Sequence, residues 1–129
     1  MNSMDENYFS KTRLDGRLIV VSGGAGLIGG EIVKCLCAHG ADVVILDLAT
    51  ERANNIAIDA SMIGGSCRFY ACNLAEVAEI PRIVEELNQI FGFINGWVNC
   101  AYPQTKDWSS KLEEVKPASW QTNVDMHLN

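Results

Sequence analysis

A glycine-rich segment, residues 22–29 with the sequence SGGAGLIG, has the residue types and spacing that most directly suggest chemistry in this chain. It follows the apolar run 18–21 and leads into an amphipathic stretch, residues 28–39. Such a turn brings backbone N–H groups close to a pyrophosphate, and the helix after it adds partial positive charge at its N-terminus. We therefore predict a dinucleotide site, with a turn that binds nothing as the alternative. The residues expected to bind the cofactor here are Gly23, Ala25, Gly26, Leu27, Ile28 and Gly29.

An acidic residue stands where such a site needs one. Residues 41–46, ADVVIL, indicate a buried strand, and Asp47 follows at about the 20-residue spacing from the glycine turn that is typical of the acid that binds the adenosine ribose. A carboxylate there accepts hydrogen bonds from the ribose hydroxyls of NAD and repels the 2′-phosphate of NADP. Leu48 comes next and the glycine turn contains no Lys or Arg, so we expect NAD to be preferred over NADP. A helix N-cap is the alternative role for Asp47.

Strand and helix signals alternate along the whole chain. Strands are expected at about 17–22, 42–47, 67–72 and 96–100, and helices at about 27–39, 50–62, 76–91 and from 117 onward. This alternation predicts an α/β fold, a Rossmann-type doubly wound parallel sheet with strand order 3-2-1-4 that ends after the fourth strand and the following helix. Residues 1–14 are expected to form a flexible leader, and residues 15–129 an incomplete dinucleotide-binding domain.

The overall composition narrows the class of protein. The 129 residues are 48% hydrophobic and carry a net charge of −6, which indicates one globular domain or part of one and argues against a nucleic-acid partner. No apolar run approaches the ~18 residues of a membrane span, so no membrane partner is expected. The five cysteines form no C-x-x-C pair, which predicts reduced thiols, no metal site and a cytoplasmic location.

Three segments together resemble the short-chain dehydrogenase/reductase family: the glycine turn, Asp47 after the second strand, and residues 98–101, VNCA, at the end of the fourth. The resemblance covers residues 15–129. The run 98–103 is similar to a subgroup associated with flagellin modification and surface-polysaccharide biosynthesis. The glycine spacing matches the extended branch of the family, the sugar-nucleotide epimerases and dehydratases. The Asn-x-Ala signature is typical of the classical reductases, and we favour this second branch.

The resemblance also implies roles for residues outside the glycine turn. In the family, the residue pair after the third strand borders the adenine, which here is Asn73 and Leu74. The Asn-x-Ala segment stabilises the central sheet beside the cofactor, which assigns that place to Asn99 and Ala101. Tyr102 stands where this segment of the family has glycine.

Catalysis in the family depends on residues that we do not expect in this chain. Members place a Ser on a later strand and a Tyr-x-x-x-Lys pair on a later helix, where the ammonium lowers the pKa of the phenol. The sequence ends at Asn129, so we expect the cofactor-binding half, inactive alone. Residues 102–106, YPQTK, have this spacing but follow the fourth strand directly, and we do not expect them to be catalytic. The family's relay Asn follows a Trp on the helix after the fourth strand, and counting from Trp120 makes His127 the candidate catalytic residue.

These features predict an NAD(P)-dependent oxidoreductase that transfers a hydride to or from a hydroxyl or carbonyl carbon of a small molecule, with a sugar or sugar nucleotide as candidate substrate. The alternatives are an extended-type epimerase or dehydratase, and a non-catalytic NAD-binding module if 129 residues are the full product. Because the fourth strand is left as an open edge, we expect the chain to self-associate, or a longer form to be a homo-oligomer.

Overall fold

The computed structural model describes residues 8–128 and contains the expected alternation of strands and helices. Two 3-10 turns, η1 (Val77–Glu79) and η2 (Leu112–Glu114), accompany the main elements. The strands are β1 (Leu18–Ser22), β2 (Asp42–Asp47), β3 (Ser66–Ala71) and β4 (Ile94–Asn99). The helices are α2 (Leu27–Ala38), α3 (Thr50–Ile63), α4 (Ile80–Phe91) and α5 (Pro117–Leu128).

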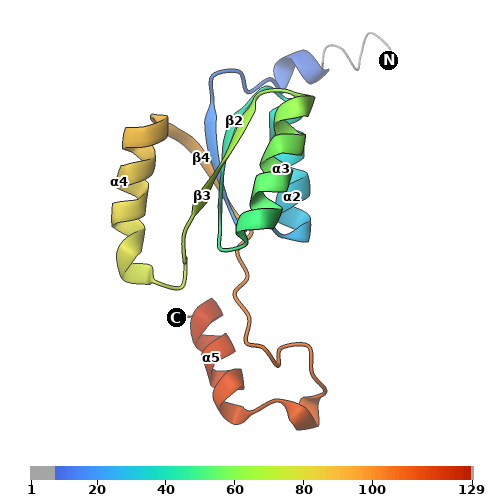
Figure 1. The fold of residues 1–129 in the computed structure, drawn as a ribbon, viewed down its shortest axis with the longest axis vertical. Coiled ribbons are helices and arrows are strands. Elements are labelled where there is room, and N and C mark those ends of the chain that lie inside the picture. The colour runs from blue at the N-terminus through green and yellow to red at the C-terminus, as the bar shows by residue number, and fades with distance from the viewer. Residues whose placement is uncertain (1–7, 129) are drawn as a thin grey trace.

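The four strands form one parallel sheet in the order β3-β2-β1-β4, which confirms the predicted topology. Helices α2 and α3 cover one face of the sheet and α4 covers the other (Figure 1). In the register of the sheet, Ser22 at the end of β1 pairs with Leu46 of β2 on one side and with Asn99 of β4 on the other. The carboxyl ends of these three strands therefore meet at one edge, where ligands bind in sheets of this type.

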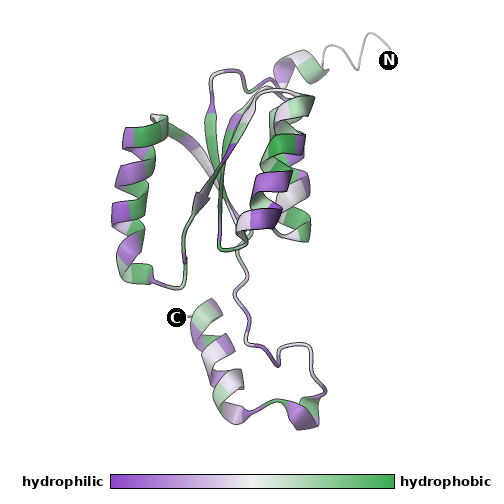
Figure 2. Cartoon of the chain, in the orientation of Figure 1, coloured by the Kyte–Doolittle hydropathy of each residue, from purple (hydrophilic) through white to green (hydrophobic). Residues whose placement is uncertain are grey.

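Apolar burial explains why the sheet stands between two helical layers. Residues 43–46 of β2 are fully buried, since helices cover both faces of this strand. On one face the core joins β1 and β2 to α2 and α3, and on the other it joins them to Ile83 and Leu87 of α4. Figure 2 shows apolar and polar residues alternating along α4, as expected of a helix that buries one face only.

The structure extends β4 toward the N-terminus beyond its expected start at residue 96. Ile94 pairs with Leu18 and Gly96 with Ile19, so the register shifts by one residue between them. Asn95 lies at this irregularity, and its side-chain Oδ1 accepts a hydrogen bond from the Leu18 backbone N–H at 2.9 Å. A side chain thus replaces one rung of the backbone ladder, which the sequence pattern of Asn95 and Gly96 did not indicate.

The second half of the expected leader, residues 8–14, is structured. Residues 8–11 are helical, and the Phe9 ring stacks on His39 with a centroid distance of 5.6 Å. The backbone N–H of Leu14 donates to the carbonyl of His39 at 2.8 Å, and the Leu14 side chain packs against the core. The part of the expected leader at residues 1–7 lies outside the described residues.

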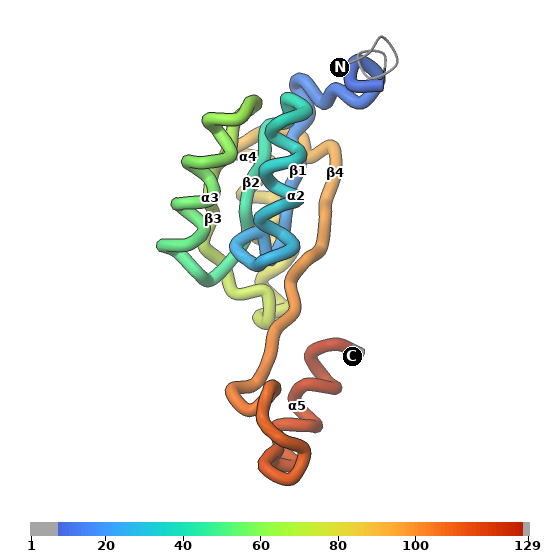
Figure 3. The backbone as a smooth tube through the Cα atoms, turned by 90° about the vertical axis from the view of Figure 1, so that its right-hand side faces the viewer, coloured from blue at the N-terminus to red at the C-terminus, as the bar shows by residue number. Residues whose placement is uncertain are grey.

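Helix α5 lies beyond the carboxyl edge of the strands rather than against a face of the sheet (Figures 1 and 3). An extended segment after β4 leads to it, and its C-terminal end points back toward the sheet. No helix among the described residues is long and apolar enough to cross a membrane. Within the same part of the chain, no group of three or more His, Cys, Asp or Glu side chains is placed to hold a metal ion, and all five cysteines are free.

The α4 core makes a direct prediction about stability. Leu87 is 0% exposed between α4 and the sheet, so Leu87→Ala leaves a cavity and is expected to lower the free energy of unfolding by about 2–5 kcal/mol. Chemical denaturation followed by circular dichroism measures this change. Leu112→Ala, at a leucine that is 85% exposed, serves as control and is expected to stay within about 0.5 kcal/mol of the wild type. Equal effects of the two substitutions would contradict the packing of α4 on the sheet.

Candidate dinucleotide site

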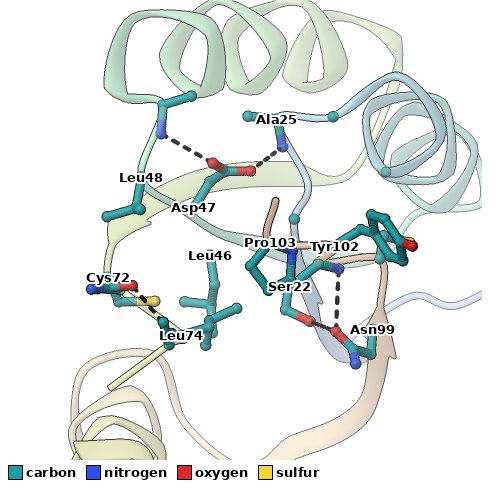
Figure 4. A pocket seen from close by; sticks show the side chains of 18 of the residues that line it. Ser22, Ala25, Leu46, Asp47, Leu48, Cys72, Leu74, Asn99, Tyr102 and Pro103 are labelled. Carbon is teal, nitrogen blue, oxygen red and sulfur yellow. Dashed lines mark hydrogen bonds between the residues drawn. The ribbon is translucent and has the colours of Figure 1, made fainter. Parts of the chain in front are cut away.

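A cavity of about 910 Å³ lies at the carboxyl edge of the strands. Its walls come from the glycine turn after β1 and the ends of β2, β3 and β4 (Figure 4). Met126, in the last part of α5, also lines the cavity. Twelve residues were expected to bind the cofactor, and the structure places all of them around this one cavity. They are Gly23, Ala25, Gly26, Leu27, Ile28, Gly29, Asp47, Leu48, Asn73, Leu74, Asn99 and Ala101.

Gly23 needs to be glycine because of both its conformation and its surroundings. Its φ of 70° lies in the left-handed region, which residues other than glycine rarely adopt. A Cβ at this position would lie 2.6 Å from the backbone N of Ala101 and from the carbonyl group of Cys100. The Gly23 N–H also donates to the carbonyl of Leu46 at 2.8 Å. The turn after β1 therefore sits directly against the ends of both neighbouring strands.

The other two glycines of the motif differ from each other in what surrounds them. A Cβ on Gly29 would clash with the carbonyl oxygen of Gly23, so this glycine lets α2 start directly on the turn. A Cβ on Gly26 would meet only the Gly23 carbonyl oxygen, at 3.1 Å, which a small shift relieves. The chain itself thus requires glycine at 29 more than at 26. Glycine at 26 keeps space free on the cavity side of the turn.

The N-terminus of α2 can attract an anion. Its N-cap is Gly26, which provides no side-chain hydrogen bond, and its first turn contains no acidic residue. The first N–H groups of a helix have no partner within the helix and carry partial positive charge, which favours a phosphate group. Leu27 and Ile28, at the start of this helix, are 81% and 74% exposed and line the cavity.

Asp47 joins the turn after β1 to the turn after β2. Its Oδ2 accepts a hydrogen bond from the N–H of Ala25 at 3.0 Å, and its Oδ1 accepts one from the N–H of Ala49 at 3.0 Å (Figure 4). The N-cap residue of α3 is Ala49, so the alternative role of Asp47 as a helix N-cap is wrong, although its Oδ1 binds the N–H of that N-cap residue. Each carboxylate oxygen accepts more than one hydrogen bond, so ribose hydroxyls can bind as well.

Asn99 and Ser22 fasten the end of β4 to the end of β1. The Ser22 hydroxyl donates to Asn99 Oδ1 at 2.6 Å, and the same oxygen accepts the N–H of Ala101 at 3.2 Å (Figure 4). Trp97 Nε1 donates to the Ser22 hydroxyl oxygen at 3.3 Å, and Ser22 is 2% exposed. Hydrogen bonds to the buried Ser22 hydroxyl therefore hold the Asn-x-Ala segment in place, and Asn99 and Ala101 also line the cavity.

The side of the cavity next to β3 is mostly apolar. Leu74, Ala75 and Ile80 line it together with Cys72. Burial, with a smaller contribution from Asp47, raises the pKa of the Cys72 thiol, so this side chain is neutral at pH 7. A flat aromatic base fits such a wall better than a charged group does.

His127, the expected catalytic residue, does not line the cavity. Its ring stacks on that of Tyr102 with a centroid distance of 4.0 Å, and Trp108 packs beside both. His127 Nε2 is buried without a hydrogen-bond partner among the described residues, and the neighbouring Met126 faces the cavity instead. A catalytic role of His127 stays a prediction. Tyr102 itself lines the cavity, but residues 101–105 form no helix, so Tyr102 and Lys106 do not share a helix face.

Other residues that line the cavity were not predicted as site residues. Arg52, on the first turn of α3, is exposed and lies at the cavity wall as the only cation among the described lining residues. Its distance of five residues from Asp47 is the signal that could have placed it there. The remaining residues of the lining are Ser22, Leu46, Ala49, Cys72, Ala75, Ile80, Trp97, Cys100, Tyr102, Pro103, Gln104 and Met126.

A polar network fixes the loop after β4 to α5. Asn123 is 3% exposed; its Oδ1 accepts the N–H of Thr105 at 3.1 Å and its Nδ2 donates to the hydroxyl of Thr105 at 2.7 Å and to the carbonyl of Ser119 at 3.0 Å. The Thr105 hydroxyl donates to Asp107 at 2.8 Å, and Asp107 also accepts the N–H of Lys116 at 3.2 Å. This network holds the wall of the cavity formed by the segment after β4.

A family model described as short chain dehydrogenase matches residues 17–129. The chain therefore belongs to the short-chain dehydrogenase family, which confirms the resemblance seen in the sequence. Among curated relatives, a 2,5-dichloro-2,5-cyclohexadiene-1,4-diol dehydrogenase of Sphingobium indicum is 30% identical over 116 residues, which cover 89% of this chain and 44% of the relative.

Solved protein structures have a fold similar to that of this chain. A metagenomic short-chain oxidoreductase in complex with NADP has a TM-score of 0.73 and 26% identity, over 88% of this chain and 50% of that one. An NAD+-bound xylitol dehydrogenase has a TM-score of 0.76 and 19% identity, over 89% of this chain and 44% of that one. The chain thus spans half or less of the length of these relatives.

Substitution by alanine is expected to affect stability differently at Gly26 and at Gly29. Gly29→Ala is expected to lower the thermal midpoint by several degrees, since its Cβ clashes with backbone that cannot move freely. Gly26→Ala is expected to change the midpoint little, because its one contact lies at 3.1 Å. Differential scanning fluorimetry of the two variants measures both. A larger loss for Gly26→Ala than for Gly29→Ala would contradict the geometry of the turn.

The loop network predicts a local effect of acid. Hydrogen bonds from Thr105, from the Lys116 N–H and from Ser119 hold the pKa of Asp107 at about 2, below its usual 3.8. The carboxylate therefore stabilises the loop fully above the usual pKa, and this contribution is lost as the pH falls through about 2. NMR titration is expected to give this midpoint for Asp107, with faster exchange of the Lys116 amide on the acid side. In Asp107→Asn the Lys116 amide is expected to lose this pH dependence, and a midpoint at the usual value in the wild type would contradict the network.

Proposed function

We propose that this chain provides the cofactor-binding part of an NAD(P)-dependent oxidoreductase that transfers a hydride between the nicotinamide and a hydroxyl or carbonyl carbon. The observation that carries the proposal is the meeting of the glycine turn with Asp47, through the 3.0 Å hydrogen bond between Ala25 N–H and Oδ2. This contact supports the proposal, because the N-terminus of α2 and the Asp47 carboxylate then border one cavity, as binding of a pyrophosphate and its neighbouring ribose requires.

The arrangement of the cavity gives the cofactor one orientation. The adenine lies on the apolar side next to β3, bordered by Asn73 and Leu74, and the adenosine ribose binds Asp47. The pyrophosphate lies at the N-terminus of α2. The nicotinamide then reaches the end of β4, where Asn99 and Ala101 are fastened to β1. Tyr102 and the residues after it lie on the substrate side of the nicotinamide.

For the choice of cofactor we propose NAD. The carboxylate of Asp47 favours free ribose hydroxyls, and Leu48 beside it offers no charge to a 2′-phosphate. Arg52 is the residue that argues for NADP, because a guanidinium at this wall could pair with a 2′-phosphate. Of two solved structures of similar fold, one is described with NAD+ and the other with NADP, so the fold is compatible with either cofactor.

The substrate we propose is a small molecule that carries a hydroxyl or carbonyl group, with a sugar or sugar nucleotide as the first class to test. The names of two similar proteins, a cyclohexadiene-diol dehydrogenase and a xylitol dehydrogenase, support hydroxyl-bearing substrates. We assign the general acid and base of hydride transfer to the part of the family's chain that lies outside the region matched by these residues. We further propose that the open edge of β4 mediates self-association, and that a longer form is a homo-oligomer.

Binding measurements on variants at two positions test the proposed cofactor. Isothermal titration calorimetry is expected to show tighter binding of NAD than of NADP by the wild type. Asp47→Ala is expected to weaken NAD by about ten- to a hundredfold, because charged hydrogen bonds are lost, and to remove the preference. Arg52→Ala is expected to leave NAD affinity nearly unchanged.

The same titrations include a negative control and outcomes that count against the proposal. Gly26→Val is expected to abolish binding of both cofactors, since its side chain fills the space left for the pyrophosphate. Tighter binding of NADP that depends on Arg52 would reverse the choice of cofactor. No binding of either cofactor to the wild type would reject the dinucleotide site itself.

A further inference from the structure

We propose that Asp47 has a second role, as a positioning residue for the pyrophosphate-binding turn. This inference rests on the proposed dinucleotide site, and it concerns the phosphate half of the cofactor rather than the ribose. In this role the carboxylate acts through Ala25, whose N–H it accepts at 3.0 Å, and so fixes the turn before any ribose hydroxyl binds.

The contacts of the turn show why one side chain matters to its shape. The turn of residues 23–26 is tied to β2 at two places: the Gly23 N–H donates to the Leu46 carbonyl at 2.8 Å, and the Ala25 N–H donates to Asp47. The first of these hydrogen bonds joins two backbone groups and does not depend on a side chain. The second depends on the side chain of Asp47 alone. Since Ala25 is 2% exposed, water has little access to replace a lost acceptor.

The charge and shape of the carboxylate suit this double task. One oxygen binds the turn after β1 and the other binds Ala49 at the start of α3, so a single rigid group sets the spacing of the two turns. A hydrogen bond to an ionised acceptor is stronger than one between neutral groups. An asparagine at this position would present an NH2 group to one of the two N–H donors, so it could satisfy only one turn at a time.

This role has a consequence that ribose recognition alone does not have. If Asp47 only accepted ribose hydroxyls, its replacement would not change the binding of a dinucleotide that lacks those hydroxyls. If Asp47 also positions the turn, the replacement weakens such an analogue too, because the N–H groups that face the pyrophosphate are no longer held in place. The two roles therefore separate in a thermodynamic cycle between the side chain and the hydroxyls.

The test combines NAD, its analogue without the 2′- and 3′-hydroxyls of the adenosine ribose, and the wild type and Asp47→Ser. Dissociation constants come from amide chemical shifts, which reach the millimolar range. We expect Asp47→Ser to weaken the analogue by about threefold to tenfold, the effect of one ordinary hydrogen bond, and to weaken NAD by more. We also expect faster hydrogen exchange at the Ala25 amide of the ligand-free variant.

A matched control exists on the same strand. Asp42 lies at the opposite end of β2, away from the cavity, and its carboxylate accepts a hydrogen bond from the Ser66 hydroxyl. Asp42→Ser removes a comparable strand-end contact and is expected to leave both dissociation constants unchanged, so a general loss of stability cannot imitate the result.

Three outcomes would overturn the inference: equal binding of the analogue to the wild type and Asp47→Ser, unchanged exchange at Ala25, or no binding of the analogue to the wild type in the millimolar range. The last result would mean that the turn contributes nothing measurable to binding without the ribose hydroxyls. Failure of NAD itself to bind the wild type would instead reject the proposed function.

Discussion

The close approach of the turn after β1 to the ends of β2 and β4 is the constraint on which the rest of the site depends. Gly23 makes it possible, because a Cβ there would lie 2.6 Å from the backbone of Ala101. With a side chain at this position, the turn would move away from the neighbouring strands. Asp47 could then no longer reach Ala25, and the backbone next to Asn99 would no longer border the same cavity as the start of α2. The lack of a Cβ at Gly23 thus allows the turn after β1 to pack against the ends of β2 and β4, and these three segments form the floor of the cavity.

The charges around the cavity come from backbone groups as well as from side chains. The N-terminus of α2 offers partial positive charge from backbone N–H groups, with no acidic residue in its first turn. Asp47 supplies a full negative charge one strand away, and Arg52 a positive charge on the first turn of α3. A ligand that fits needs an anionic centre flanked by a hydroxylated group, which is the pattern of a dinucleotide. For the proposed cofactor, the opposite charges of Asp47 and Arg52 are the features that would favour a 2′-hydroxyl and a 2′-phosphate respectively.

The two halves of the cavity wall are held by different forces. On the side of β1, β2 and β3, apolar side chains buried between the helical layers hold the strands in place. On the side of α5, the segment after β4 depends on hydrogen bonds among Thr105, Asp107 and Asn123, and on the rings of Tyr102 and His127. A wall held by a few polar contacts opens at lower free energy than a buried core does. The side of the cavity next to the sheet is therefore expected to be the more rigid one, and the side next to α5 the more easily rearranged.

Local patterns in the sequence predicted the alternation of strands and helices, the strand order and twelve of the residues that line the cavity. These follow from local patterns, since buried parallel strands are continuous apolar runs and the carboxyl ends of such strands meet at one edge. The positions of single side chains became clear only from the folded chain: His127 stacks on Tyr102, Arg52 lies at the cavity wall, and Asn95 replaces a backbone hydrogen bond of β4. It also showed that Asp47 binds both turns at once. The physical reason is that periodicity assigns a residue to an element, whereas the direction of its side chain depends on packing between segments far apart in the chain.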